Sequence, residues 1–362
     1  MSKPSNYTKE SVKAFASAVL QGFGCSKLET DVVASHLLDA NLTGHDSHGI
    51  GMLPMYGEQV LDGNLVPDQA PRFLDTTGAI SIVDAQRGFG HRMALLALDH
   101  AMRNVPEHRV AILALRNSGH VSRVGAYSEY CAAQGYVSMH MVNVVGHAPI
   151  VAPFGARESG ISTNPISMAM PVDGRAEPLL DMATSTVAFG KVRVASNKGE
   201  KMPPGCLLDE QGLETLDPDP MALSRLGSLS AFGAHKGSGL GLFVELMAGA
   251  LGSTDTVATM EHLPHGVINN MFSIIIDPTA FDSREAVAGR THDFCQFIKS
   301  RAPAAGTQSV LLPGEPENLS RDQRTTSGIP LDVQTINQIV DIAVRFELQA
   351  DTVRGLLESK RA

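Results

Sequence analysis

The sequence predicts a mixed α/β protein in which helices from both ends of the chain accompany a central region of alternating strands and helices. The segments before about residue 79 and after Asp332 carry apolar residues at helical spacing. Between them, short runs rich in Val, Ile and Leu alternate with helical stretches, which is typical of layered α/β domains. We therefore expect residues 1–78 and 315–362 to form one helical domain and residues 79–314 to form an α/β domain.

The composition argues against several classes of protein. The 362 residues include 38 acidic and 29 basic side chains, and the formal charge of −9 without a long basic run speaks against a nucleic-acid or membrane-surface partner. No run approaches the about 20 apolar residues of a membrane span, and the N-terminus lacks the apolar core of a signal peptide. Cys25, Cys131, Cys206 and Cys295 are far apart and form no CxxC pair, so we expect reduced thiols and a cytoplasmic protein.

Helix signals are clear at both ends of the chain. Thr8 is a predicted cap for a first helix, and Ser26-Lys-Leu-Glu29 has the pattern of a capping box for a second helix that ends near Gly44. Pro54 is expected to open a third helix. Asp332 can cap the last helix of the chain.

The central region supplies the predicted sheet. Its strands are expected at residues 80–83, 110–115, 136–142, 165–170 and 271–276. Helices are expected after Gly90 and after Val121. Residues 197–229 are rich in Pro, Gly and Asp and predict an excursion of loops and short elements, and residues 302–330 are expected to be irregular.

A polar cluster follows the second of these strands, at Arg116-Asn-Ser-Gly-His120. Ligands of open α/β sheets bind at the carboxyl ends of strands, so His120 is placed where an imidazole could exchange a proton with a substrate. The alternative is a turn whose polar side chains only cap the following helix.

A second cluster, His45-Asp-Ser-His-Gly49, lies on a loop between two helices. Two histidines three residues apart could hold a metal, but the HExxH pattern and paired Cys/His ligands are absent, so we expect no metal site. A second active-site histidine, His48, explains the cluster more economically. A structural turn held by Asp46 and Ser47 is the alternative.

Three further stretches could contact a bound polar ligand. Thr163 and Asn164 offer hydrogen-bond donors. The segment Asp181–Ser185 reads as a strand end followed by a helix start, and Gly233–Leu242 as a glycine-rich turn that enters a helix, with Lys236 as a cation. Ordinary helix capping and close helix packing are the alternatives. The stretch Gly233–Leu242 is neither a Walker loop nor a GxGxxG fingerprint.

These clusters combine backbone amides that could bind a phosphate with two histidines, and the sequence has no GxSxG nucleophile motif. The combination favours redox chemistry with a nucleotide cofactor. The clusters also resemble, in order and spacing over nearly the whole chain, the type 2 malate/L-lactate dehydrogenases, a family that includes sulfolactate dehydrogenases and cyclic-imine reductases. The matching motifs are Gly44–Gly49, Asn117–His120, Thr163–Pro165, Asp181–Ser185, Gly190–Lys191 and Lys236–Leu240. Residues 203–206, 311–315 and 328–332 resemble one branch of that family.

The resemblance implies an NAD(P)-dependent oxidoreductase with a non-Rossmann fold, whose cofactor domain is built on a mixed sheet within residues 79–314. It also implies a homodimer that interconverts a 2-hydroxy acid and a 2-oxo acid, with NAD as the expected cofactor and NADP not excluded. His120 would be the general acid/base, with His48 and Ser47 in the same site. The cofactor contacts would be Asp181, Met182, Ala183, Thr184, Lys236 and Gly237.

Two positions depart from the family pattern: Met52 stands where many members have Arg, and Ser162 where most have Gly. We therefore expect Met52 to face a bulky or aromatic side chain of the substrate and Arg123, about one helical turn after His120, to bind its C1 carboxylate. Ordinary packing for Met52 and a solvated helix position for Arg123 are the alternatives.

Thr163 and Asn164 would complete the substrate site. Two other functions stay open at this point. One is a cyclic-imine carboxylate reductase of the same family. The other is a non-redox metal protein that uses His45, His48 and His120.

Overall fold

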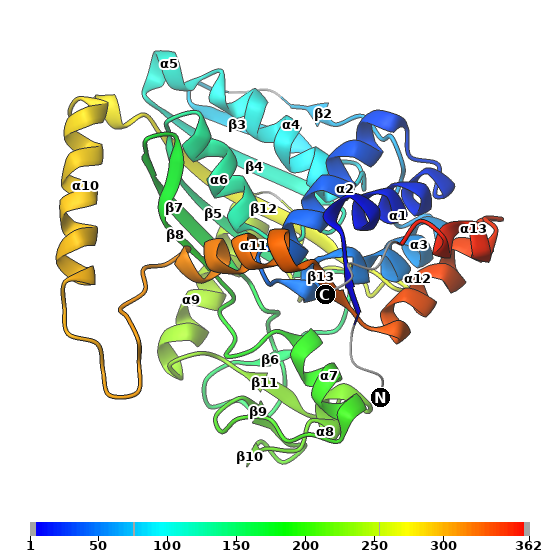
Figure 1. Ribbon diagram of the computed structural model, residues 1–362. Helices are drawn as coiled ribbons and strands as arrows, with labels where there is room; N and C mark the ends of the chain where they lie inside the picture. Colours follow the sequence, from blue (N-terminus) through cyan, green and yellow to red (C-terminus); the bar gives the residue numbers. More distant parts are fainter. Residues whose placement is uncertain (1–4, 75–76, 253, 358–362) are drawn as a thin grey trace.

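A seven-stranded mixed sheet forms the centre of the computed structural model, which describes residues 5–74, 77–252 and 254–357 (Figure 1). In order across the sheet the strands are β2 (Arg72–Phe73), β3 (Ile80–Asp84), β4 (Val110–Ser118), β12 (Ile268–Ile276), β5 (Val137–Val145), β7 (Ile166–Val172) and β8 (Arg175–Met182). β3 and β4 are parallel and the other neighbours antiparallel. The predicted α/β class and mixed sheet are confirmed.

The two faces of the sheet carry different helices. α4 (Gly90–Met102) and α6 (Gly125–Ala133) pack on the apolar residues of one face, among them Leu113 and Val142. Successive side chains of a strand point to opposite faces, so Asn143 lies on the other face, where its amide donates to Glu245 at 3.0 Å. Glu245 ends α9 (His235–Glu245), which continues as the π-helical segment η3 (Leu246–Leu251).

A helical core is assembled from both ends of the chain, on the right in Figure 1. Its helices are α1 (Lys9–Gly22), α2 (Lys27–Leu42), α3 (Leu53–Leu61), α12 (Val333–Arg345) and α13 (Ala350–Arg354). Strand β1 (Ser5–Tyr7) pairs with β13 (Ile329–Leu331) and ties the ends together. The predicted caps are confirmed: Thr8 accepts from the amide of Ser11 and Asp332 from that of Thr335.

The excursion after residue 197 belongs to a lobe at the bottom of Figure 1. Its elements are β6 (Val151–Ala152), α7 (Phe189–Lys198), β9 (Leu207–Leu208), β10 (Glu214–Thr215), α8 (Asp219–Ala222) and β11 (Ser228–Ser230). The four strands form a second sheet in the order β10-β9-β11-β6. The expectation of short elements in this region is confirmed.

The expectation that residues 302–330 are irregular is wrong, because α11 (Glu315–Ser327) occupies part of this segment. α11 buries none of its residues and is held by polar contacts instead, such as Ser320 Oγ donating to Leu42 O at 2.9 Å. A search for apolar periodicity therefore overlooks it. The same applies to α10 (Arg284–Lys299), which also buries none of its residues.

Four short helices complete the fold: α5 (Val105–His108) and the 3-10 turns η1 (Asp46–His48), η2 (Ile50–Met52) and η4 (Pro278–Ala280). Among the described residues, no helix has the length and apolar character needed to cross a membrane.

Candidate functional site

His120 lies just beyond β4, on a loop whose backbone is fixed by a hydrogen bond on either side of it. The amide of Gly119 donates to Gly88 O at 2.9 Å, and the amide of Val121 donates to Asn269 Oδ1 at 2.9 Å. β4 runs further than predicted, through Ser118, so Asn117 and Ser118 belong to the strand. Only His120 of the predicted polar trio is therefore left on the loop.

Glycine is required at position 90, where α4 begins against this loop. A Cβ on Gly90 would lie 2.2 Å from Gly119 O and 2.4 Å from His120 O, closer than any side chain allows. The close approach lets α4 begin directly beside the histidine loop. It also brings the next residue, His91, into the interior beneath His120.

Tyr56 on α3 backs the imidazole of His120. Its hydroxyl lies 2.9 Å from Nδ1 of His120 and 3.5 Å from Nε2 of His91. Tyr56 and His91 are both buried, and Nδ1 of His91 has no hydrogen-bond partner in the described part of the chain. Because Nδ1 of His120 is engaged, Nε2 is the ring nitrogen left for a substrate.

His48, which the sequence analysis assigned to the same site, stacks on His120. Their ring centroids are 5.8 Å apart and the planes differ by 18°. Ser47 Oγ lies 3.0 Å from Nδ1 of His48, and Ser122 Oγ donates to His48 O at 2.7 Å. Three side chains of the predicted site, from segments far apart in the sequence, are thus adjacent.

Both histidines are neutral at physiological pH. Burial, followed by the neighbouring His48, His36 and His147, lowers the pKa of His120 to about 3. Burial, followed by His45 and Arg123, lowers the pKa of His48 to about 4. A neutral imidazole with a free Nε2 is a proton acceptor, so the site is prepared to remove a proton from a bound hydroxyl group.

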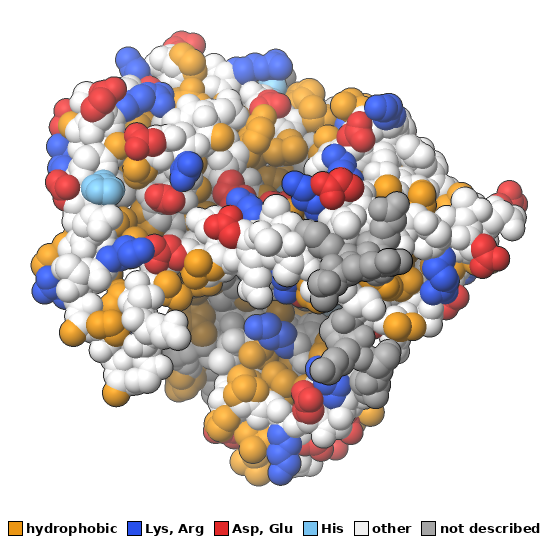
Figure 2. Space-filling view, in the orientation of Figure 1, with side chains coloured by type: hydrophobic (Ala, Val, Ile, Leu, Met, Phe, Trp, Pro, Cys, Tyr) orange, Lys and Arg blue, Asp and Glu red, His pale blue; other side chains and the backbone are white. Residues whose placement is uncertain are grey.

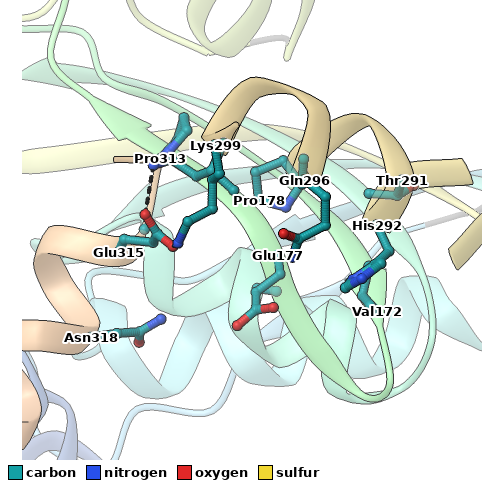
Figure 3. Close-up of a pocket in the computed structure, with 14 residues that line it drawn as sticks. Val172, Glu177, Pro178, Thr291, His292, Gln296, Lys299, Pro313, Glu315 and Asn318 are labelled. Atoms are coloured by element: carbon teal, nitrogen blue, oxygen red, sulfur yellow. Dashed lines mark hydrogen bonds and ion pairs between the residues drawn. The ribbon is translucent and has the colours of Figure 1, made fainter. Parts of the chain in front are cut away.

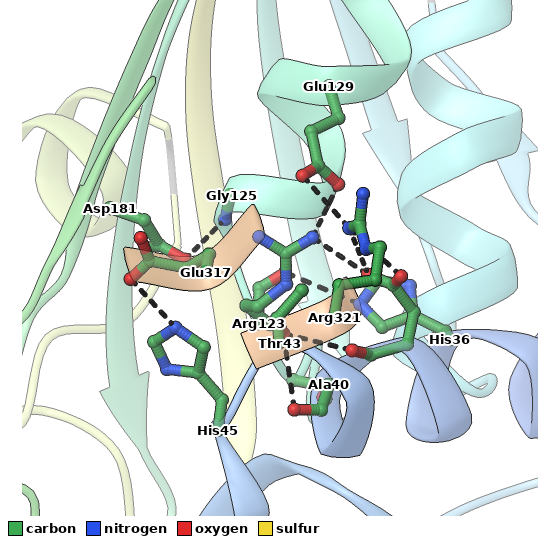
Figure 4. A network of polar contacts seen from close by, with 12 residues as sticks. His36, Ala40, Thr43, His45, Arg123, Gly125, Glu129, Asp181, Glu317 and Arg321 are labelled. Atoms are coloured by element: carbon green, nitrogen blue, oxygen red, sulfur yellow. Dashed lines mark hydrogen bonds and ion pairs between the residues drawn. The ribbon is translucent and has the colours of Figure 1, made fainter. Parts of the chain in front are cut away.

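His45 points away from this pair. Its Nε2 lies 3.3 Å from Glu317 Oε1 on α11 (Figure 4). Within the ranges that the structure describes, no three His, Cys, Asp or Glu side chains are grouped as a metal site would require. A metal protein built on His45, His48 and His120 therefore has no geometric support.

Arg123 corrects the sequence analysis. Its side chain is only 1% exposed and pairs with Asp39 on α2, at 2.9 Å, and with Glu129 on α6 (Figure 4). Arg321 from α11 joins the same two carboxylates. Burial lowers the pKa of Arg123, but Glu129 and Asp39 raise it by more. A guanidinium so neutralised cannot be the clamp for a substrate carboxylate.

The other predicted substrate residues differ in accessibility. Met52 is half-buried and packs against the helical core, which matches the ordinary-packing alternative while leaving part of its surface exposed. Asn164 is fully buried, and its amide donates to Gly241 O at 3.0 Å and to Glu245 Oε2 at 2.8 Å. Thr163 O accepts from Thr184. Asn164 thus supports the site from within the protein.

The segment Asp181–Ser185 does not begin a helix, contrary to expectation, because α7 begins only at Phe189. Asp181 Oδ2 instead accepts from the amide of Gly125 at 2.9 Å, and burial raises the pKa of this carboxyl (Figure 4). Thr184 is fully buried and bonds to Thr163 O. Met182 and Ala183 remain partly exposed and available to a ligand.

The predicted glycine-rich turn is in fact the first part of α9 itself. The amides of Lys236, Gly237 and Ser238 already donate to the carbonyls of Gly233, Phe232 and Ala234. A phosphate therefore cannot use these amides, and Gly237 is buried. The side chain of Lys236 is exposed, and no ion pair involves it in the described chain. It is the group of this segment that remains available to an anion.

A separate pocket lies between the β7–β8 hairpin, α10 and the start of α11 (Figure 3). The ion pair of Lys299 with Glu315 crosses it, and Glu177 and His292 line it. None of the predicted site residues belongs to its lining. It is a different surface from the histidine site.

Tyr56 and His91 are two residues of the site that the sequence does not reveal. Nothing in their local sequence marks them, since each lies on an amphipathic helix among core residues. The adjacent Gly90 was used only as a helix start. Arg225, considered below, was missed because it lies in the loop-rich excursion.

The comparisons with known proteins agree with this geometry. The family model for malate/L-lactate dehydrogenase matches residues 7–340. Hydroxycarboxylate dehydrogenase B of Escherichia coli K12 is 39% identical over 354 residues, 97% of each chain. Two solved structures also match: sulfolactate dehydrogenase of Methanocaldococcus jannaschii (29% identity, TM-score 0.85, 96% and 99% of the chains) and Δ1-piperideine-2-carboxylate reductase of Pseudomonas syringae pv. tomato (28%, 0.81, 93% and 99%).

The fold, the paired histidines and these relatives define an oxidoreductase of the dehydrogenase class. The chain belongs to the malate/L-lactate dehydrogenase family. The relative from E. coli also confirms the branch indicated by residues 203–206, 311–315 and 328–332.

Proposed function

We propose that this chain oxidises a 2-hydroxy acid to the 2-oxo acid, and catalyses the reverse reduction, with a nicotinamide dinucleotide. The observation that carries the proposal is the contact of Tyr56 with His120, which leaves Nε2 of a neutral imidazole free to accept the hydroxyl proton. Relatives named hydroxycarboxylate and sulfolactate dehydrogenases support a hydroxy acid as the substrate. Ser47 and His48 line the same site.

The bound nicotinamide would supply the hydride acceptor for the C2 hydrogen. We assign the contacts with the dinucleotide to Met182 and Ala183, which are partly exposed, and to the unpaired cation Lys236. Asp181, Thr184 and Gly237 would act indirectly, by fixing the backbone that carries these groups. We propose NAD as the cofactor, with NADPH titration as the test of NADP.

For the substrate we propose a 2-hydroxy acid with a bulky or aromatic side chain. Met52 supplies a flexible apolar surface and no positive charge, so a second carboxylate such as that of malate would lack a partner there. Thr163 is the other residue that we place beside the substrate.

Steady-state kinetics on lactate, malate and phenyllactate test the proposal, together with NADH fluorescence titration and elemental analysis. We expect NADH binding, no stoichiometric metal, and the highest kcat/KM for phenyllactate. A kcat/KM for malate well above that for phenyllactate would contradict the substrate. Stoichiometric zinc without NADH binding would instead leave a metal protein as the better reading.

A second candidate function is reduction of a cyclic imine carboxylate. It is favoured by the likeness to Δ1-piperideine-2-carboxylate reductase. Consumption of NADPH with Δ1-piperideine-2-carboxylate, at a kcat/KM above that for every 2-oxo acid tried, would select this function.

We also infer a homodimer. α10 exposes Phe294 and Phe297, and α9 exposes Leu242 and Phe243, all by at least half. Apolar surface of this extent marks protein contacts, and sedimentation at twice the monomer mass would support the dimer. A cytoplasmic location stays a proposal, supported by the four free cysteines.

A further inference from the structure

Arg225 is an exposed cation in the loop between α8 and β11. Its Cζ lies 3.8 Å from the centre of the Phe189 ring, so the guanidinium is stacked flat on an aromatic face. Its φ of +60° places a non-glycine residue in the left-handed region, which such residues adopt rarely. Stacking fixes the plane of the group while its edge N–H donors stay free.

The positive charge of Arg225 is not balanced by a carboxylate. Among the described residues, every ion pair within 4.0 Å involves other side chains. Burial beside Phe189 and the nearby Arg193 lower the pKa of Arg225, which is the direction expected where cations gather without anions. An anion placed here would relieve this repulsion.

The residue after the aromatic partner of Arg225 touches the loop that carries His48. Phe189, on which Arg225 stacks, begins α7, and the next residue, Gly190, would bring a Cβ within 3.1 Å of Ser47 Cβ. Ser47 in turn contacts Nδ1 of His48 at 3.0 Å. The start of α7 therefore packs directly against the loop that carries His48.

His147 lies on the loop after β5. Its pKa is lowered first by burial and then, among its neighbours, by Arg225 and His262. Its Nδ1 lies 2.6 Å from the carbonyl of Ala148, so Nδ1 donates and Nε2 remains free. The surface between the lower lobe and the body of the molecule is hollowed, with Lys and Arg side chains beside the hollow (Figure 2).

We propose that Arg225, held on the Phe189 ring at the start of α7, forms an oxyanion-binding site beside the loop that carries His48. Two ligands offer this chemistry: the C1 carboxylate of the hydroxy acid and a phosphate of the dinucleotide. A guanidinium edge binds either group through two parallel hydrogen bonds. The inference rests on the proposed function, and it supplies the cationic partner that the buried Arg123 and the apolar Met52 cannot.

The test uses the full-length protein and the variants Arg225→Gln and Arg225→Lys. Arg157→Gln is the matched control, because Arg157 is an exposed arginine near the same lobe that pairs with Glu158. Initial rates are measured with phenyllactate and with phenyllactamide, its uncharged analogue. Dissociation constants for NADH and, in the presence of NADH, for oxamate are measured at equilibrium. Melting temperatures check that each variant is folded.

If the site holds the substrate carboxylate, Arg225→Gln lowers kcat/KM for phenyllactate and weakens oxamate by about 10- to 100-fold, the usual value of a charge-assisted contact, and leaves phenyllactamide and NADH unchanged. If it holds a phosphate, NADH binding weakens by a similar factor instead. The values of kcat/KM and of the dissociation constants for Arg225→Lys should lie between those of wild type and Arg225→Gln, because lysine keeps the charge but lacks the paired N–H donors of the guanidinium.

The oxyanion site is overturned if wild type and Arg225→Gln have equal kcat/KM for phenyllactate and phenyllactamide and equal dissociation constants for NADH and oxamate. It is also overturned if Arg157→Gln changes these values as much as Arg225→Gln does. Failure of the proposed function looks different. In that case the wild-type protein itself turns over no 2-hydroxy acid with NAD or NADP, whereas failure of the site alone leaves wild-type turnover intact.

Discussion

The hydroxyl of Tyr56 lies 2.9 Å from Nδ1 of His120, and it is the only side-chain contact on that nitrogen among the hydrogen bonds of the described residues. The hydroxyl can accept from Nδ1–H while donating to Nε2 of His91, 3.5 Å away. In that arrangement the ring presents its basic nitrogen to the substrate. Under the proposed function, Tyr56 is a positioning residue that selects the tautomer of His120.

Replacing Tyr56 with Phe should lower kcat about 3- to 10-fold and leave NADH affinity unchanged, because one hydrogen bond of about 1 kcal/mol no longer fixes the tautomer. The acid limb of the pH profile should also shift, which loss of packing alone would not cause. Stopped-flow and steady-state kinetics measure both effects. An unaltered kcat and pH profile would exclude the positioning role.

His120→Asn should reduce turnover by about 10²- to 10⁴-fold, the usual contribution of a general base, while NADH still binds. Fluorescence titration of NADH is the control for folding and cofactor binding. Turnover near the wild-type value would transfer the proton-accepting role to His48.

Because the pKa of His120 is lowered to about 3, kcat/KM should depend on pH differently for oxidation of the hydroxy acid and for reduction of the oxo acid. Oxidation needs the neutral imidazole, which predominates throughout the range from pH 5 to pH 8, so this group should leave kcat/KM flat there. Reduction needs the protonated imidazole, so its kcat/KM should rise about tenfold for each unit by which the pH falls. Initial rates in both directions over this range provide the measurement.

Arg123→Ala should destabilise the protein by about 1 to 3 kcal/mol, because it leaves a buried vacancy and removes one of the two guanidinium groups that pair with Asp39 and Glu129, the other being that of Arg321. Arg157→Ala is the control, since its exposed pair with Glu158 should contribute less than about 1 kcal/mol. Urea unfolding measures both. A normal stability with a large rise in KM would restore Arg123 as a substrate ligand.

Acid should destabilise the fold through histidines that are buried as neutral groups. Burial lowers the pKa of His140, which lies between Ser273 and Ser138, to about 3. The unfolded chain takes up a proton near pH 6.5 and the folded chain does not, so stability is full above pH 6.5 and falls until the pH approaches 3.

His140→Gln should therefore reduce the slope of unfolding free energy against pH by about one proton, or about 1.4 kcal/mol per pH unit, between pH 6 and pH 4. Urea midpoints at several pH values supply the slope. His108→Gln, which alters a histidine on the exposed α5, should keep the wild-type slope. The same slope in His140→Gln and wild type would refute this account.

Local signals explain which parts of the fold could be predicted. Thr8 and Asp332 cap their helices as expected because a cap depends on the next three residues alone. The capping box at Ser26 shows the limit. Glu29 does not return to the Ser26 amide as the motif implies; Asp68 takes that amide at 2.6 Å, while Glu29 accepts from the amide of Asp68.

Within the site, His120, His48 and Ser47 could be found because polar clusters interrupt apolar runs. The burial of Arg123 could not be found, since its partner Asp39 on α2 is 84 positions away and the second cation of the network, Arg321, comes from α11. Tyr56 could not be found for a related reason. Its partner His120 is 64 positions away in the sequence, and the spacing of apolar residues in its helix predicts only that each of them is buried in the core.

The pairing of β1 with β13 has a consequence for biosynthesis. α1, α2 and α3 are made well before Ile336 and Ile339, which complete their core. Contacts of such long sequence separation form slowly and leave apolar faces accessible to chaperones in the meantime. Tyr56 sits on α3, so its contact with His120 should become fixed only once α12 has been made and has packed.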